Sequence, residues 1–301
     1  MLDIPRTECK ILNMDEKAIN IDRYPQLRSP VLVAGFEGWG NALDVSKTMV
    51  NYLIRNLDAQ PFARVNGDLF YRFDESRPWV DIEGGYLKTI EAPGGTLYSV
   101  QIKDSERDLI LLRASEPHLR WYTFVDGILS LCKRLNTSTI ITLGSMYDNV
   151  LHSDVVISGI ASSSELVARL ESKNVIPITY QGPTAIHSVF HSKGQEMGFE
   201  CISLWCHCPY YLQGATHYGL IAALSDIVAS FCQFKLDTTE LDLSWKELNR
   251  QIQELVEKNP DLQKMIDGLR KAKVKGSWES RKASVKRDDK VIHIEDFLRP
   301  K

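Results

Sequence analysis

The chain has 301 residues, of which 44% are hydrophobic and 25% are charged, with 36 Lys and Arg against 39 Asp and Glu. This composition excludes a collagen-like, a disordered and a disulfide-scaffold protein, and the length corresponds to one large or two modest domains. The balanced charge gives no indication of a nucleic-acid or membrane-surface partner for the whole chain.

The first predicted unit is a strand, a glycine loop and a helix. Residues 30–35 form a short apolar run with β-branched side chains, which is typical of a buried parallel strand. The loop Phe36-Glu-Gly-Trp-Gly40 follows, and Asn41 is a candidate helix cap. Apolar residues then recur every three or four positions and predict a helix with one buried face: Ala42, Val45, Met49, Leu53 and Leu57.

The next stretch, residues 63–103, has a different pattern. Apolar and polar side chains alternate in four short segments, residues 70–73, 79–82, 86–90 and 97–102. Glycines and a proline separate these segments. This pattern predicts antiparallel hairpins at a sheet edge or in a small subdomain.

Strands and helices alternate again after residue 107. We expect strands at 108–113, 139–144, 154–160, 175–178 and 200–205, and helices at 118–135, 162–172, 184–197 and 216–234. Buried strands alternating with helices predict a three-layer α/β fold with a mainly parallel sheet. The most apolar run, residues 218–234, contains Asp226 and is interpreted as a buried helix rather than a membrane span.

The C-terminal part has a different character. Residues 244–258 and 260–271 predict two helices with Pro260 at the first position of the second, and thus an α-helical hairpin. Residues 270–290 carry nine Lys or Arg against three acids, and we interpret them as a solvated linker rather than a nucleic-acid site, because Trp278 is their only aromatic residue. Residues 291–298 are a short amphipathic tail. We therefore expect an α/β core at 1–240, a helical hairpin at 241–272, and a basic linker with a docking tail at 273–301.

The localisation expected from the sequence is cytoplasmic. The first 22 residues are polar and carry charges every few positions, so they contain no apolar signal-peptide stretch. Six cysteines in 301 residues are too sparse for a disulfide framework, and most lie in apolar patterns where a free thiol packs as a small hydrophobic group.

Ligands of parallel α/β sheets bind beyond the carboxyl ends of the strands, and this defines a candidate pocket. The residues expected there are Gly38, Trp39, Gly40, Asn41, Glu116 and His152. The glycine loop could offer backbone N–H groups and a helix N-terminus to an anion. However, its spacing matches neither a dinucleotide fingerprint nor a P-loop, so a tight turn with a packed Trp39 is the simpler interpretation.

Three catalytic or metal hypotheses compete with structural roles for the same residues. Glu116 could be a general base with His152 as the acid, although a Glu before Pro equally suits a helix N-terminus. Cysteines and histidines near residue 206 lack the spacing of a zinc site, since Cys206 and Cys208 would face one side of a strand and His207 the other. Ser145 lacks the second glycine of a nucleophile elbow. We therefore expect no metal site and no cofactor, and catalytic residues remain unassigned.

Five groups of residues form an ordered set of motifs along the chain: Gly35-Phe-Glu-Gly-Trp-Gly-Asn-Ala42, Ser115-Glu-Pro117 with Trp121, Thr142-Leu-Gly144 with His152, Tyr180-Gln-Gly-Pro183, and Ser203-Leu-Trp205 with Pro209-Tyr-Tyr-Leu212. Together these motifs resemble the proteasome-assembly-chaperone family, in its second-chaperone-like prokaryotic branch. The resemblance implies a phosphorylase/hydrolase-like fold and self-assembly into small rings, often trimers. It also implies a chaperone or scaffold role, with a possible protein client, rather than established catalysis.

Two functions from different classes follow. The first is a homo-oligomeric assembly-chaperone-like or scaffold protein that is not an enzyme and binds neither nucleic acid nor membrane. The alternative is a small-molecule-binding enzyme or sensor that uses an anion pocket at the strand ends, because fold alone does not determine function.

Overall fold

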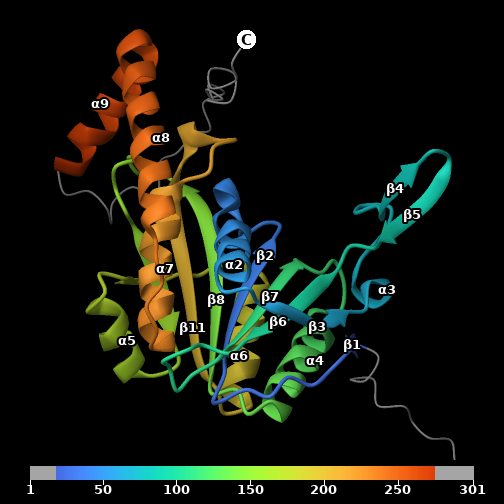
Figure 1. The fold of residues 1–301 in the computed structure, drawn as a ribbon. Coiled ribbons are helices and arrows are strands. Elements are labelled where there is room, and N and C mark those ends of the chain that lie inside the picture. Colours follow the sequence, from blue (N-terminus) through green and yellow to red (C-terminus); the bar gives the residue numbers. More distant parts are fainter. Residues whose placement is uncertain (1–17, 275–301) are drawn as a thin grey trace, which may run out of the picture.

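The computed structural model describes residues 18–274, and its main feature is a nine-stranded sheet (Figure 1). The strand order is β1-β3-β6-β7-β2-β8-β11-β9-β10. The strands are β1 Ile19–Ile21, β2 Val31–Glu37, β3 Gln60–Val65, β6 Gly95–Val100, β7 Leu109–Ser115, β8 Thr139–Asp148, β9 Ile157–Ala161, β10 Ile176–Pro177 and β11 Glu200–Pro209.

The sheet is parallel at its centre and mixed overall. Strands β7, β2, β8 and β11 run in one direction, whereas β1, β3 and β6 pair antiparallel on one side. On the other side, β9 is antiparallel to β11 and β10 is parallel to β9. The expectation of a mainly parallel sheet therefore fits the four central strands only. The short connection at residues 101–108 has no helix, so β6 and β7 pair antiparallel rather than through a crossover.

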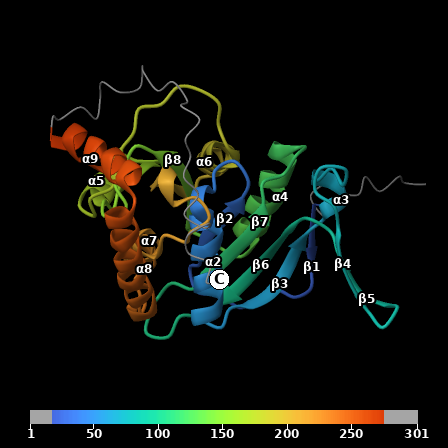
Figure 2. The same ribbon diagram turned by 90° about the horizontal axis from the view of Figure 1, so that it is seen from above.

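Helices cover both faces of the sheet and form three layers (Figure 2). Helices α2 (Val45–Asn56) and α7 (Tyr218–Cys232) bury their apolar side chains against one face, and α4 (Trp121–Arg134) and α6 (Ile186–Glu196) cover the other. A shorter helix, α5 (Ser164–Glu171), joins the first of these cores. Alternate residues of β2 enter opposite cores, which explains why this strand is apolar throughout.

The prediction for residues 63–103 was partly wrong. Residues 70–73 are not a strand as expected, since Phe70 is the last residue of a helical turn, α3 (Gly67–Phe70). The Asn66 side chain caps this turn by accepting a hydrogen bond from the N–H of Asp68. Strand β6 joins the main sheet, while β4 (Trp79–Glu83) and β5 (Tyr86–Glu91) form a separate two-stranded sheet. This β4–β5 hairpin projects away from the rest of the molecule in both views (Figures 1 and 2).

Two consecutive helices, α8 (Thr239–Lys258) and α9 (Pro260–Val274), follow the sheet. Helix α8 buries Leu248 and Ile252 in the α7 side of the core. The Asn259 side chain accepts hydrogen bonds from the N–H groups of Asp261 and Leu262, so it caps α9, with proline at the first helical position. The α8 helix begins at Thr239, more than one turn before the predicted start at residue 244.

Two sequence predictions fall at the end of the chain. Most of the basic segment 270–290 and all of the tail 291–298 lie outside the described residues. Between residues 18 and 274, no helix combines the length and the apolar character that a membrane crossing requires.

Candidate functional site

The glycine loop after β2 is closely packed rather than hollow. Gly38 has φ +130°, a conformation that favours glycine, and a Cβ atom there would come 2.9 Å from the Cβ of Glu116. A Cβ atom on Gly40 would lie 3.0 Å from the His187 ring and 3.1 Å from the Trp205 ring. These two glycines therefore let neighbouring side chains approach the backbone.

Glu116 occupies the N-terminus of α6. Its Oε1 atom accepts a hydrogen bond of 2.8 Å from the backbone N–H of Ile186, the first residue of that helix. A carboxylate at this position satisfies a free donor and complements the helix dipole. The Glu116 carboxylate thus caps α6 beside Gly38, whereas the helix end that the sequence offered to an anion is that of α2.

Asn41 holds the loop through its side chain. Its Oδ1 atom accepts from the N–H of Lys47 (3.3 Å), and its Nδ2 group donates to Asp44 (2.9 Å). The prediction of a simple helix cap needs correction, because a short 3₁₀ turn, η1 (Ala42–Asp44), separates Asn41 from α2. Asn41 also pairs with Ser145 in an isolated parallel bridge, so the loop continues the sheet beyond β2.

Trp205 and His187 fill the interior beneath the loop. Their ring centroids are 4.8 Å apart, and the Trp205 ring lies directly over Gly144. His187 Nε2–H donates to the Leu143 carbonyl (2.8 Å), while Nδ1 has no hydrogen-bond partner among the described residues. Burial lowers the pKa of His187 to about 4, so the ring is neutral near pH 7.

His152 lies in a different place from the rest of the predicted pocket. The Tyr211 hydroxyl accepts from the His152 backbone N–H (2.7 Å) and hydrogen-bonds its Nδ1 atom (2.8 Å). The His152 carbonyl accepts from His217 Nε2–H (3.0 Å), and its ring packs edge-on against Trp245 of α8. His152 therefore joins the loop after β8 to α7 and α8. The proposed acid–base pair is not formed, because Glu116 contacts α6, on the other face of the sheet.

A polar relay connects three strands beside Trp205. His207 Nδ1 is 2.7 Å from Asp148 Oδ2, and His207 Nε2 is 2.8 Å from Ser158 Oγ. Burial disfavours the charged Asp148 carboxyl, but the hydrogen bonds from His207 and Asn149 outweigh it and hold the pKa below its usual range. This order of groups is that of a serine hydrolase. However, Ser158 is only 1% exposed, so protein covers its hydroxyl and the relay ties β8, β9 and β11 together.

The sequence reasoning missed this relay, because its members are separated along the chain and join only through the pairing of β11 with β8 and β9. The cysteines nearby have a separate role. Cys206 and Cys208 lie in the core on the face of β11 that is opposite to His207, and burial raises the pKa of the Cys206 thiol to about 12. Among residues 18–274, no three His, Cys, Asp or Glu side chains are grouped so that they could hold a metal ion.

Exposed apolar side chains follow the carboxyl ends of three central strands. We call them the strand-end patch: Trp39 after β2, Leu119 and Tyr122 after β7, and Tyr210 after β11. Their exposed fractions are 67%, 46%, 63% and 45%. Large apolar groups that face solvent at one end of a sheet are typical of a protein interaction surface.

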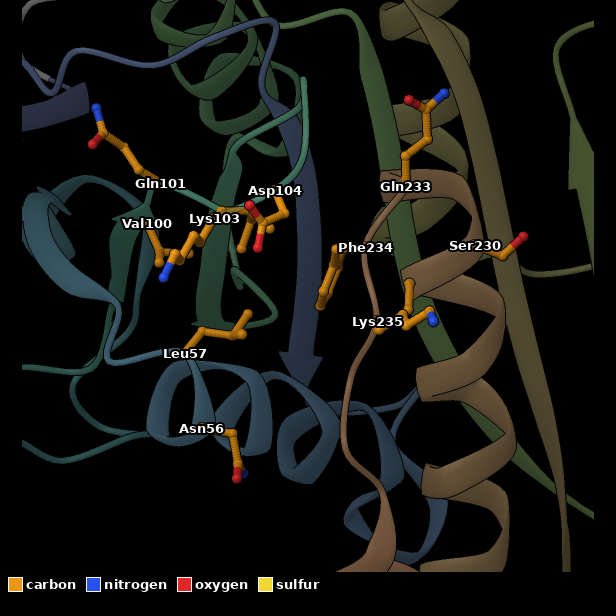
Figure 3. A pocket seen from close by; sticks show the side chains of 12 residues that line it. Asn56, Leu57, Val100, Gln101, Lys103, Asp104, Ser230, Gln233, Phe234 and Lys235 are labelled. Carbon is orange, nitrogen blue, oxygen red and sulfur yellow. The ribbon is translucent and has the colours of Figure 1, made fainter.

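A hollow of about 730 Å³ lies at the opposite end of the parallel strands (Figure 3). It is formed by the C-terminal ends of α2 and α7 and by the segment before β7, with Leu57 and Phe234 facing each other across it. It contains none of the residues of the predicted pocket, which belong to the other end of the sheet.

Comparison with known proteins gives one family. The family model described as PAC2 family matches residues 32–256. A PAC2 family protein from Streptomyces avermitilis is 28% identical, with 75% of this chain and 95% of that chain covered and a TM-score of 0.69. A proteasome-assembly chaperone homologue from Mycobacterium tuberculosis is 26% identical, with 78% and 99% covered and a TM-score of 0.71.

More distant structures share the fold. The archaeal proteasome activator PbaB from Pyrococcus furiosus is 19% identical, with 79% of this chain and 99% of that chain covered and a TM-score of 0.62. A comparison with curated protein sequences finds no match.

Proposed function

Because the chain belongs to the PAC2 family, we propose that it is a homo-oligomeric, assembly-chaperone-like or scaffold protein that binds a protein client. Two of the similar structures are a proteasome-assembly chaperone homologue and a proteasome activator, which supports a role in protein assembly. The finer parts of the proposal are a phosphorylase/hydrolase-like core at 1–240, a helical hairpin at 241–272 and a docking tail at 273–301. They also include a trimeric ring and a cytoplasmic location.

The observation that carries this proposal is the strand-end patch. At the end of the sheet where α/β proteins place their ligands, this chain exposes Trp39, Leu119, Tyr122 and Tyr210. Large aromatic groups supply much of the binding energy of protein interfaces. We assign the patch to the client.

The packing below the patch supports a surface rather than a small-molecule pocket. The Glu116 carboxylate already occupies the N-terminus of α6, and the Trp205 ring lies against Gly40 and Gly144. An anion bound at the glycine loop would lie close to the Glu116 carboxylate beside Gly38, and the like charges would repel each other. The alternative of an anion-binding enzyme or sensor is therefore not favoured.

The experiment compares protein capture by the wild type with capture by the double variant Trp39→Glu, Tyr122→Glu. Leu243→Glu is the matched control, because Leu243 is 64% exposed on α8, away from the patch. Capture from an isotope-labelled lysate is quantified by mass spectrometry. We expect the double variant to lose the enriched protein by about ten-fold or more, the effect of removing a hot spot, and the control to retain it.

Binding of inorganic phosphate provides the opposing measurement. Stoichiometric binding to the wild type in calorimetry, abolished by Gly40→Ala in the glycine loop, would contradict the client-binding proposal and support the pocket. Equal capture by the wild type and the double variant would also contradict it.

A further inference from the structure

The β4–β5 hairpin exposes several large apolar side chains to solvent. Every residue of both strands is exposed. The exposed fractions are 64% for Trp79, 61% for Ile82, 75% for Tyr86, 61% for Leu87 and 63% for Ile90. Isolated apolar residues are normal on a protein surface, but a contiguous group of this size indicates an interaction site.

The register of the hairpin sorts its side chains onto two different faces. Val80 pairs with Ile90 and Ile82 pairs with Leu87. Residues opposite each other in an antiparallel pair point to the same side of the sheet, as do residues two apart on a strand. These four residues, Val80, Ile82, Leu87 and Ile90, therefore make one aliphatic face.

The second face is amphipathic. It carries Trp79 opposite Glu91, Asp81 opposite Thr89, and Glu83 opposite Tyr86. Water can solvate the acids of this face, whereas the aliphatic face has no polar side chain in its paired positions. Only the aliphatic face therefore gains stability by being covered with other apolar groups.

A two-stranded sheet with an open apolar face is marginally stable in water. Within residues 18–274, the body of the chain does not supply the cover, because the hairpin extends away from it in both views (Figures 1 and 2). With Val80 41% exposed and the fractions above, covering the aliphatic face would bury on the order of 400 Å² of its surface, about half of the ~800 Å² that each partner contributes to a standard interface. Since no element between residues 18 and 274 covers this face, a second molecule can supply the cover.

We propose that the aliphatic face of the β4–β5 hairpin packs against a second copy of this chain. The inference rests on the homo-oligomer of the proposed function and identifies the segment that forms its contact. The hairpin is part of every molecule, so its cover must be present at equal stoichiometry whenever the chain is folded. A second copy satisfies this condition without any other protein.

The arrangement of the molecule fits a contact that repeats around a closed ring. A ring with identical contacts requires each copy to present two different, complementary surfaces. The hairpin lies on one side of the molecule, and α5, α8 and α9 lie on the opposite side (Figure 2). The receiving surface that we assign is at this opposite edge, where the sheet ends at β10 and Ile176 and Val155 are 51% and 53% exposed.

The experiment measures the mass of the full chain by native mass spectrometry and by light scattering over a dilution series. The variants are Ile82→Glu and Leu87→Glu on the aliphatic face, with Trp39→Glu as the matched exposed control, because Trp39 is 67% exposed and belongs to the separate strand-end patch. Because these side chains are exposed, we expect their replacement to leave the core intact. Circular dichroism and the melting temperature of each variant check this. We expect the concentration at half-assembly to rise about ten-fold or more in both hairpin variants and to stay unchanged in the control.

Cross-linking of a mixture of unlabelled and ¹⁵N-labelled protein locates the contact directly. Lys88 lies on the hairpin and Lys173 lies close to β10, and an amine-reactive reagent that links them between a light and a heavy chain supports the proposal. If every link from Lys88 joined two peptides with the same isotope label, and none joined a light to a heavy peptide, the proposed contact would be overturned.

The outcomes separate this inference from the proposed function. A wild-type monomer at every concentration contradicts both. An oligomer that persists unchanged in Ile82→Glu and Leu87→Glu overturns the hairpin contact and leaves the homo-oligomer in place. Loss of assembly in these variants together with unchanged client capture supports both, because the strand-end patch is a separate surface.

Discussion

Replacing Gly144 by alanine tests whether the interior below the strand-end patch is as full as the geometry indicates. An added Cβ atom would lie 2.9 Å from two atoms of the Trp205 ring and 3.0 Å from a third. Contacts this short require the ring or the strand to move. Gly144 lies within β8, which is hydrogen-bonded to β11 on one side, so the backbone has little freedom to adjust.

The expected cost follows from overpacking. Inserting a methyl group into a filled core destabilises a protein by about 1–3 kcal/mol, and a glycine-to-alanine change returns only about 0.4–1 kcal/mol by restricting the unfolded chain. We therefore expect Gly144→Ala to lower the free energy of unfolding by about 1–2 kcal/mol, which corresponds to roughly 2–6 °C in melting temperature for a chain of this size.

Urea unfolding at fixed protein concentration, followed by tryptophan fluorescence and circular dichroism, measures the change. Gly268→Ala is the matched control, because no atom lies within 4 Å of its added Cβ and helix α9 gains about 0.5–1 kcal/mol from the substitution. In the background of Trp205→Phe the cost at Gly144 should largely disappear, since the smaller ring leaves room. A Gly144→Ala protein as stable as the wild type, or an equal cost in both backgrounds, would refute the steric reasoning.

Three other predictions concern named contacts. Burial lowers the pKa of both His187 and His217 to about 4 from the ordinary 6.5, so the unfolded chain binds more protons than the folded chain between these values. Stability is then fully present above pH 6.5 and is lost as the pH falls toward 4, by about 3 kcal/mol per histidine, which urea unfolding across this pH range measures. Glu116→Gln keeps the acceptor for the α6 N–H but removes the charge, and should lower the free energy of unfolding by less than about 1 kcal/mol, against about 1–2 kcal/mol for Glu116→Ala. Trp245→Ala removes the ring that stacks on His217 at a centroid distance of 4.4 Å, and should cost about 2–4 kcal/mol and increase hydrogen exchange selectively in α8.

The fold was largely predictable because its central elements have strong periodic patterns. The apolar run at 30–35 and the helix that follows it depend on local sequence alone, and both are present. Strands β1 and β3 were not predicted, since β1 has three residues and β3 contains Pro61, which weakens a strand pattern. Both strands lie beyond β6, outside the parallel centre of the sheet. Hydrogen bonding to a neighbouring strand, rather than a periodic pattern of apolar residues, determines the structure there.

The candidate site was less predictable, because its contacts join residues far apart in the chain. Gly38 lies against Glu116, because the two residues follow the neighbouring strands β2 and β7. The bond from Ile186 to Glu116 could not be read from spacing, and it changes Glu116 from a candidate base into a helix-terminal anion. His152 also follows the carboxyl end of a parallel strand in the sequence, but its loop turns toward α8 and away from the other predicted pocket residues.

The bulge in the β4–β5 hairpin has a consequence for fibre formation. The register shifts between Asp81 and Ile82, so Lys88 is an extra residue on β5 that has no partner across the ladder. A bulge bends and twists a strand, and a lysine at the edge must stay solvated, so a strand from another molecule cannot extend the ladder along the whole hairpin. The hairpin can thus offer its aliphatic face to one neighbour without becoming a template for endless strand addition. Removing Lys88 would restore regular alternation along β5 and take away the charge on this edge, so that strand addition would be less restricted.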